Sequence, residues 1–296
     1  MATVVTRLAY DAVSATSTTV DGLRPIRGPS ALGGSPQRFW TLTWTLAVLE
    51  FRLKFFGSVL GYFWQLMRPL LMFGVLYFVF TELVRLGGGV NNYPVMLLMG
   101  IIIYTFYAEA TGTSVSSVAD HETLVRKVHF PRLVIPLSVV LTTYLNFVLN
   151  FVAVMLFVVA SGIEPRWSWL QIFPLILVLG ILSAGIGTML SALYVRYRDV
   201  QPIWEVALQI SFYGSPILYP IEKIPEEGLQ HLIMCNPLAV IVEQARHAIV
   251  DPAAPSAAEA IGGAQWLLIP LSILVLACVL GYVIFDRSAP HIAEEL

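Results

Sequence analysis

The chain has 296 residues, of which 57% are apolar and only 12% are charged, with a formal net charge of −2 at pH 7. Soluble domains have about 45–50% apolar and about 25% charged residues, so this composition excludes an ordinary soluble domain and predicts a polytopic membrane protein. The absence of a basic excess argues against nucleic-acid binding, and two cysteines in separate apolar stretches indicate neither a disulfide framework nor a metal cluster.

The N-terminal segment 1–37 is rich in Ser, Thr, Gly and Pro and has no apolar core. It therefore does not resemble a secretory signal. We expect a largely disordered tail in the cytoplasm.

Residues 38–56 (RFWTLTWTLAVLEFRLKFF) are apolar but contain several charges. Their aromatic residues recur at spacings of four, seven and four, which places them on one helical face. An aromatic face with basic flanks predicts a helix that lies in the membrane interface. The alternative is a cytosolic helix packed on a partner. The candidate interface residues are Trp40, Trp44, Arg52 and Lys54.

Six transmembrane helices are predicted from runs of about 20 apolar residues between charges. They lie at about 62–84, 94–118, 133–160, 169–195, 202–218 and 263–285. The fifth is the weakest and contains Glu205. Small residues on the fourth span (Gly180, Gly185 and Gly187) favour close helix contact, either within the subunit or across a dimer.

Residues 220–252 contain two apolar runs that meet at Asn236-Pro237. Each run is about 10–14 residues long, which is too short to cross a bilayer. We expect a re-entrant helical hairpin on the outer side; the alternative is an amphipathic hairpin outside the bilayer. The predicted fold class is an all-α membrane protein, with a transmembrane domain over 38–286 and a short cytoplasmic tail over 287–296.

The basic residues indicate the orientation. Of the 17, only Arg85, Arg166, Lys223 and Arg246 fall on the predicted outer side. The positive-inside rule therefore places both termini in the cytoplasm of a multi-pass plasma-membrane protein.

No catalytic motif is present in the sequence: there is no Walker A pattern, no HExxH and no GxSxG. The five histidines have no spacing typical of zinc ligands. We therefore expect a chain that is not an enzyme and binds no metal or other cofactor.

Two charged segments lie on the predicted cytoplasmic side. In ADHETLVRKVHFP (119–131) we expect a short helix with Asp120 as N-cap, Glu122 in the first turn, and Arg126 and Lys127 in the last turn. The second segment, YVRYRDVQP (194–202), contains two arginines and an aspartate. Both could be contacts for a cytosolic motor, or ordinary positive-inside anchors.

Five blocks of the sequence, taken together, resemble ABC-2 type transporter permeases for polysaccharide export. They are KFFGSVLGYFWQLMRPLLMFGVLYFVF (54–80), KVHFPRLVIPLSVVLTTYLNFVLNF (127–151), YVRYRDVQPI (194–203), SPILYP (215–220) and NPLAVIVEQAR (236–246). The blocks follow the order of the family, and the pattern is most similar to permeases for O-antigen and teichoic acid.

This resemblance implies a homodimer of six-helix subunits that transports a lipid-linked polysaccharide of O-antigen, teichoic acid or galactan type. Two copies of a separate ATPase subunit would bind the dimer and hold ATP and Mg, which agrees with the missing Walker A pattern. The residues that the resemblance places at or near the ATPase are Asp120, His121, Glu122, Arg126, Lys127, Arg196, Arg198 and Asp199.

Glu109 lies within a span, where an isolated charge costs about 2.5–3.5 kcal/mol. We hypothesise that it faces the channel of the dimer. Aromatic residues near the outer ends of the spans could form an interfacial belt, or a surface on which sugar rings stack. The candidate channel and sugar contacts are Tyr77, Phe78, Tyr104, Glu109, Tyr213 and Tyr219.

Three alternatives stay open at this point. An ABC-2 type exporter of a smaller lipid or drug would share the fold. An integral membrane glycosyl or acyl transferase would need a cluster of His, Asp or Glu on one membrane face, which the sequence does not offer. A proton-coupled carrier is disfavoured because no inverted repeat is visible.

Overall fold

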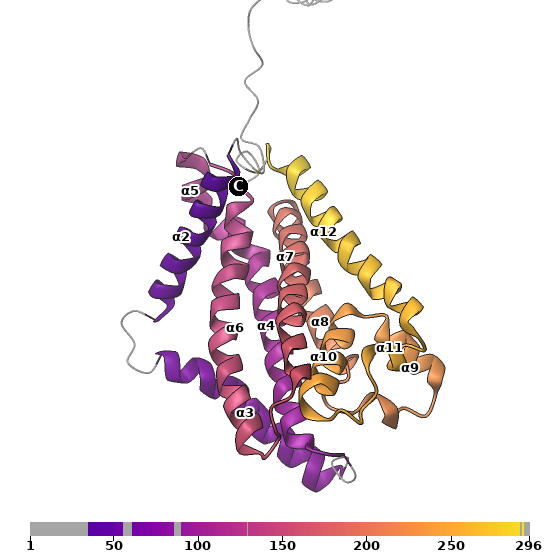
Figure 1. Ribbon diagram of the computed structural model, residues 1–296. Helices are drawn as coiled ribbons and strands as arrows, with labels where there is room; N and C mark the ends of the chain where they lie inside the picture. The colour runs from indigo at the N-terminus through magenta and orange to yellow at the C-terminus, as the bar shows by residue number, and fades with distance from the viewer. Residues whose placement is uncertain (1–34, 56–60, 86–89, 129, 291, 293–296) are drawn as a thin grey trace, which may run out of the picture.

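The computed structural model describes residues 35–55, 61–85, 90–128, 130–290 and 292. The described residues form helices joined by turns and short irregular loops, and none lies in a strand. Three long helices, α4, α6 and α7, form the centre of the bundle, with α2 and α3 at one side and α12 at the other (Figure 1). The predicted tail falls largely within 1–34, and His129 and most of 291–296 likewise lie outside the described residues.

The α-helices are α2 (Pro36–Phe55), α3 (Gly61–Phe78), α4 (Tyr93–Asp120), α5 (Glu122–Lys127), α6 (Val134–Ala160), α7 (Ile172–Arg196), α8 (Val200–Tyr213), α9 (Glu227–Met234), α10 (Pro237–Ala245), α11 (Ala257–Ala260) and α12 (Leu268–Ser288). Short π or 3-10 segments adjoin them: η1 (Val79–Leu83), η2 (Trp167–Gln171), η3 (Ile221–Lys223), η4 (Arg246–Val250) and η5 (Ala264–Leu267).

Five helices of the described residues are long and apolar enough to cross a membrane. They are Phe63–Leu83, Tyr93–Asp120, Val134–Ala160, Trp167–Arg196 and Ala264–Ser288. These match five of the predicted spans closely, so the all-helical, multi-pass membrane architecture is confirmed.

The predicted fifth span, 202–218, corresponds to α8, which has 14 residues. At about 1.5 Å per residue it is about 21 Å long, which is shorter than the hydrocarbon core of about 30 Å. The chain leaves the helix at Gly214, and Ile217 then packs against Gly100 of α4. The count of six complete spans therefore stays a prediction.

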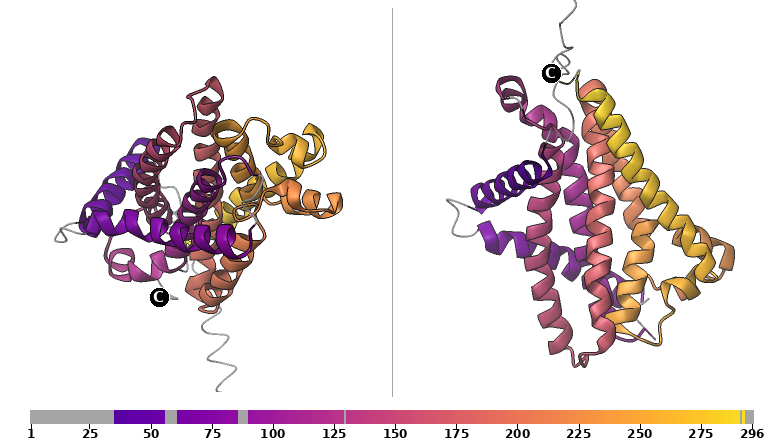
Figure 2. Two further views of the ribbon diagram at one scale, coloured as in Figure 1. Left: turned by 90° about the horizontal axis from the view of Figure 1, so that it is seen from below. Right: turned by 45° about the horizontal axis from the view of Figure 1, so that its top comes forward.

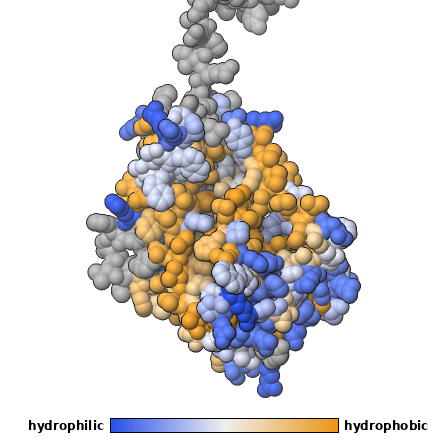
Figure 3. Space-filling view, in the orientation of Figure 1, coloured by the Kyte–Doolittle hydropathy of each residue, from blue (hydrophilic) through white to orange (hydrophobic). Residues whose placement is uncertain are grey.

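The long helices differ in how much of their surface the subunit covers. Among the 18 most apolar consecutive residues of each span, 72% are buried in α4, compared with 6% in the span of α3 and 11% in the span of α12. The space-filling view shows apolar side chains over the middle of the bundle and polar ones toward its two ends (Figure 3). This surface matches what a bilayer requires around a bundle whose central helix is α4.

Small residues on α7 allow three neighbouring helices to come close. A Cβ on Gly281 of α12 would overlap the carbonyl oxygen of Gly185, and one on Gly187 would lie 2.8 Å from Oγ of Ser114 in α4. Gly180 faces the ring of Tyr144 in α6. Figures 1 and 2 show α12 running alongside α7. In this subunit the small-residue face therefore packs against helices of the same chain.

One end of the bundle gathers the two described ends of the chain (Figure 1). A hydrophobic cluster there joins Phe39 of α2, Val125 of α5 and Phe285 of α12. The buried Arg132 guanidinium donates a hydrogen bond to the carbonyl of Ala289. The start of α2 and the end of α12 are thus packed together, on the end that also carries α5.

The opposite end carries α9, α10 and α11. Most of α10 is buried, whereas most of α9 is half-buried or exposed. Asn236 caps α10, because its side-chain oxygen accepts a hydrogen bond from the backbone N–H of Leu238 at 3.0 Å. Residues 220–252 thus include two short helices joined at Asn236-Pro237, as expected, while their insertion into the bilayer stays a prediction.

Candidate functional site

Glu109 in α4 is paired with the end of α2. Lys54 Nζ lies 2.5 Å from Glu109 Oε1, and Gln65 Nε2 of α3 donates to Glu109 Oε2 at 3.3 Å. A carboxylate within a membrane-spanning helix is costly unless a cation compensates it. The structure therefore gives Glu109 a partner within its own subunit. Its exposure to a dimer channel stays a hypothesis.

A second contact joins α2 to the end of α4. His121 Nε2 lies 3.4 Å from Glu50 Oε1, and His121 Nδ1 lies 2.8 Å from the carbonyl of Ser117. Thr142 of α6 donates to Glu50 Oε2 at 3.3 Å. The hydrogen bond to Glu50 raises the pKa of His121 above its ordinary value, although burial opposes it. Protonation of His121 therefore strengthens the contact between α2 and α4.

These two pairs line one cavity between α2, α4 and α6, with a volume of about 330 Å³. The cavity brings together four predicted site residues, Lys54, Glu109, Asp120 and His121. A smaller cavity of about 10 Å³, about the space of one water molecule, adjoins it and is also lined by Glu109. In it, the buried amide of Asn146 has no hydrogen-bond partner among the described residues. A polar path thus extends from the end of α4 into the bundle.

The short helix α5 follows directly on α4. Val125 anchors it in the hydrophobic cluster, while Arg126 and Lys127 are exposed. Arg126 Nη2 lies 3.0 Å from Glu122 Oε1, an i,i+4 pair along the helix. The predicted short charged helix is therefore present, with a solvent-facing basic end.

The prediction that Asp120 caps this helix is wrong. Asp120 is the last residue of α4, and its Oδ2 accepts a hydrogen bond from Ser116 Oγ at 2.7 Å. His121 occupies the capping position of α5, without a side-chain capping bond. The reason is that α4 continues one residue past the point where the sequence suggested a break.

Arg196, Arg198 and Asp199 lie at the turn between α7 and α8 and are exposed. The Arg196 guanidinium stacks over Tyr197 at 5.5 Å from the ring centroid, and that of Arg198 over Tyr194 at 4.8 Å. This turn lies at the same end of the bundle as α5 (Figure 1). The structure therefore places both predicted charged segments at one end.

The helix α2 packs along α6 through Phe39, Thr43 and Ala47, which are buried at a spacing of four. Trp40 and Trp44, on the adjacent side, remain 63% and 54% exposed. Arg52, like Lys54, lies in the last turn and is exposed. The two tryptophans thus lie together on the surface, as expected, and the orientation of α2 in a membrane interface stays a prediction.

The predicted sugar contacts divide into buried and exposed groups. The Tyr104 hydroxyl donates to the carbonyl of Leu208 at 2.8 Å, and its ring lies 4.7 Å from that of Phe212. Tyr77 is half-buried and stacks on Phe73 at 5.7 Å. Tyr104 therefore holds α8 against α4, and its hydroxyl already has a partner within the protein.

The other aromatic candidates reach the surface. Phe78 is 58% exposed and Tyr213 is 66% exposed. Tyr219 is half-buried and donates its hydroxyl to the carbonyl of Tyr213 at 3.1 Å. Phe78 and Tyr213 are therefore the aromatic candidates whose rings a ligand could reach in this subunit.

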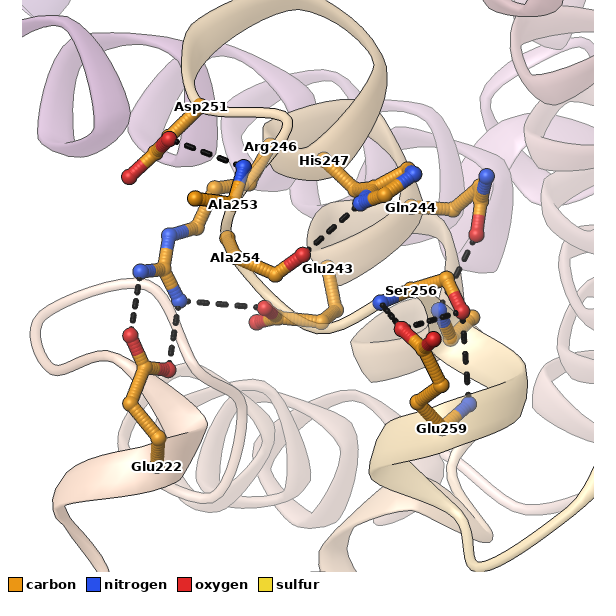
Figure 4. A network of polar contacts seen from close by, with 11 residues as sticks. Glu222, Glu243, Gln244, Arg246, His247, Asp251, Ala253, Ala254, Ser256 and Glu259 are labelled. Carbon is orange, nitrogen blue, oxygen red and sulfur yellow. Dashed lines mark hydrogen bonds and ion pairs between the residues drawn. The ribbon is translucent and has the colours of Figure 1, made fainter.

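A network of charged side chains joins η3, α10 and η4 at the end of the bundle that carries α9 to α11 (Figure 4). Arg246 binds Glu222 with two hydrogen bonds and Glu243 with one. Burial raises the pKa of Glu243 to about 7, whereas the hydrogen bond to Arg246 lowers the pKa of Glu222 in spite of its burial. From the sequence, Arg246 was predicted to be a charge on the outer side and the last residue of the block 236–246, without a partner. The contact between Arg246 and Glu243 could have been predicted from their i,i+3 spacing in an apolar run. The contact with Glu222 had no such sequence signal.

Residues 41–250 match the ABC-2 type transporter family. The chain is 29% identical over 200 residues to the O-antigen export system permease protein RfbA of Myxococcus xanthus, covering 67% of this chain and 76% of that protein. It is 30% identical over 194 residues to RfbA of Klebsiella pneumoniae, covering 65% and 74%. It is 27% identical over 210 residues to the polysialic acid transport protein KpsM of Escherichia coli, covering 69% and 80%. The matched region includes the charge pairs of α2 and α4 and the network of Arg246, and the chain belongs to the ABC-2 type transporter family.

Proposed function

We propose that this chain is the permease subunit of an ATP-driven exporter that moves lipid-linked polysaccharide across the plasma membrane. The observation that carries the proposal is the similarity to three export or transport proteins whose names specify O-antigen or polysialic acid. Two copies of the chain form the channel, and two copies of a separate ATPase subunit supply ATP hydrolysis with Mg. Both termini lie in the cytoplasm, together with α5 and the turn between α7 and α8.

The contacts of α5 support its role as the element that the ATPase moves. Its basic end is exposed, and Val125 joins it to the cluster that also holds α2 and α12. His121, which lies between α4 and α5, contacts α2: its Nε2 lies 3.4 Å from Oε1 of Glu50. A force applied to α5 therefore reaches α2 through one ion pair and one hydrophobic cluster.

The second ion pair determines how such a force affects the bundle. Lys54 and Glu109 link the end of α2 to the middle of α4, the helix with the largest buried share. When the ATPase subunits close, α2 and α4 move together as long as both pairs persist. This movement separates the two subunits and opens a path for the polymer.

The exposed aromatic rings support a sugar polymer as the substrate. Phe78 and Tyr213 present apolar faces on which sugar rings can stack without a requirement for one sequence of sugars. A stacking surface of this kind suits a long chain that must slide through the channel, whereas a tight pocket would hold it.

The proposal can be tested in cells that produce the polymer. Depletion of the chain should remove the polysaccharide from the cell surface while it accumulates inside, and depletion of the ATPase should have the same effect. Loss of surface polymer without internal accumulation would contradict export and indicate a role in synthesis.

A second experiment tests the contact with the ATPase. The variant Arg126→Glu/Lys127→Glu should reduce the amount of ATPase that co-purifies with the permease. The matched control is Lys223→Glu, which reverses an exposed charge at the opposite end and should co-purify with the ATPase like the wild type. Equal co-purification of all three proteins would contradict the placement of the motor at α5.

A further inference from the structure

An open apolar groove of about 470 Å³ lies between α6 and α7. Its walls come from Val148 and Val152 of α6 and from Phe173 and Ile176 of α7. The groove lies toward the end of the bundle that carries α9 to α11, where Ser168 of η2 donates a hydrogen bond to the carbonyl of Ala248 at 2.6 Å. It shares no residue with the charged cavity between α2 and α4.

The length of the groove matches one leaflet of a bilayer. On α6 it extends from Tyr144 to Met155, a rise of about 16 Å at about 1.5 Å per residue. Half of a hydrocarbon core of about 30 Å is about 15 Å. The deep end lies where Tyr144 meets Gly180, and the other end lies at the connection between α6 and α7.

A basic side chain without an ion-pair partner among the described residues lies at that outer end. Arg166 is the one charged residue of the lining, and it makes no ion pair with any described residue. The ring of Trp169 lines the same end of the groove, whereas its indole nitrogen is buried below the groove surface. The outer end therefore fits a ligand that carries negative charge and exposed oxygen acceptors.

We propose that this groove binds an anionic phospholipid of the adjacent leaflet. One acyl chain lies between α6 and α7, and the phosphodiester accepts hydrogen bonds from the exposed guanidinium of Arg166. The arrangement of the groove, with donors at one end and an apolar surface of one leaflet's length beyond them, matches the amphiphilic order of a lipid.

The test uses the purified full-length chain in nanodiscs with phosphatidylglycerol that carries a photoreactive group at the end of one acyl chain. A phosphatidylcholine probe with the same chain serves as the neutral control. Labelled peptides are identified by mass spectrometry. The phosphatidylglycerol probe should label peptides within 144–155 and 169–176 more strongly than the phosphatidylcholine probe does. Arg166→Gln should reduce the phosphatidylglycerol labelling about fivefold, as expected when one basic residue is lost from a membrane surface.

Two further variants separate filling of the groove from general damage. Val152→Trp fills it and should remove the labelling by both probes, whereas Val159→Trp, on an equally exposed position of α6 outside the groove, should leave it unchanged. Equal labelling by the two probes in the wild type would overturn the proposal. Unchanged labelling in Val152→Trp, or cross-links between two copies of the chain at these peptides, would also overturn it.

Discussion

The guanidinium of Arg246 binds both carboxylate oxygens of Glu222, with Nη1–Oε2 at 2.8 Å and Nη2–Oε1 at 2.5 Å. The side chain of Arg246 is 3% exposed and that of Glu222 is 43% exposed. A third hydrogen bond, at 3.0 Å, joins Arg246 to Glu243, which is fully buried. The pair therefore ties the segment before α9 to η4, and it makes the fold of this end depend on one buried cation.

Replacement of Arg246 by methionine should destabilise the protein strongly. It leaves Glu243 buried without a cation, and breaking a buried ion pair in this way costs about 3–5 kcal/mol. The measurement is the midpoint of thermal unfolding of the purified chain in detergent. Glu222→Gln serves as the matched control, because Glu222 is partly exposed and glutamine can still accept a hydrogen bond; its loss should be smaller. An Arg246→Met protein as stable as Glu222→Gln would contradict this prediction.

The stability of the protein should also depend on pH through Glu243. Burial raises the pKa of Glu243 from 4.5 to about 7, so the folded chain holds this proton more tightly than the unfolded chain does. The stabilisation linked to this proton is complete below pH 4.5 and is lost as the pH rises through about 7. The unfolding midpoint of the wild type should fall between pH 5 and pH 8, and Glu243→Gln should show a smaller fall.

Titration of the neighbouring Glu222 does not contribute to the change in stability between pH 5 and pH 8. The pKa of Glu222 is lowered, so its linked stability is present above its ordinary pKa of 4.5 and is lost only as the pH falls through its lower folded value. Equal pH slopes for the wild type and Glu243→Gln would show that Glu243 is not the group that titrates.

The close approach of α7 and α12 should tolerate no added methyl group. A Cβ at Gly281 overlaps the carbonyl oxygen of Gly185, so Gly281→Ala must push the two helices apart, at a cost of about 1–3 kcal/mol. Gly74→Ala is the control, because nothing lies within 4 Å of a Cβ at that position in α3. The unfolding midpoint should fall for Gly281→Ala and not for Gly74→Ala. The same midpoint for both variants would contradict the packing.

Much of the fold could be predicted because charges are costly in a bilayer. Charges such as Arg166 and Arg196 bounded an apolar run, and five of the predicted spans became long helices at nearly the predicted residues. The length of α8 could not be predicted in the same way. Hydropathy continues past Tyr213, but the chain turns at Gly214 so that Ile217 can pack on α4, and this packing depends on the tertiary fold.

The sequence pointed to individual candidate residues, but it did not indicate which side chains they contact in the fold. Glu109 was recognised from its cost within a span, yet Lys54 lies 55 positions earlier in the chain, and no local periodicity connects them. The same holds for Glu222 and Arg246, which are 24 positions apart. Asp120 illustrates the opposite error: its residue type favours a helix start, but Ser116 holds its carboxylate at the end of α4.

Coupling between Lys54 and Glu109 should appear in a double-mutant cycle. Glu109→Leu leaves Lys54 without its anion, and Lys54→Met leaves Glu109 without its cation, so each variant should reduce export per ATP hydrolysed. The double variant removes both charges and should recover part of the activity, because the effects of substituting two groups in direct contact are not additive. Glu205→Gln, an exposed carboxylate on α8, should export normally. Strictly additive losses would show that the pair does not act as a unit.

Substitutions of Tyr104, which contacts α8 from α4, and of Tyr213, the last residue of α8, should differ in their effect on export. Tyr104 donates its hydroxyl to the carbonyl of Leu208, so Tyr104→Phe should lose about 0.5–1.5 kcal/mol of stability and retain export once folded. Tyr213 is 66% exposed, and its side-chain hydroxyl makes no hydrogen bond with a described residue. Tyr213→Ala loses a ring contact with Phe212 at 5.3 Å, worth about 0.5–1.5 kcal/mol, and should export less polymer per ATP hydrolysed than this small loss of stability explains.

A third variant separates stacking from hydrogen bonding at this position. Tyr213→Phe keeps the ring and removes the hydroxyl, so it should export nearly as well as the wild type if sugar rings stack on the aromatic face. Export by Tyr213→Ala equal to that of the wild type would remove Tyr213 from the sugar path. Export by Tyr213→Phe as low as that of Tyr213→Ala would instead assign the contact to the phenolic hydroxyl, because the ring alone would then contribute nothing. The ratio of transported polymer to hydrolysed ATP, measured for all three proteins with the same ATPase subunit, distinguishes these results.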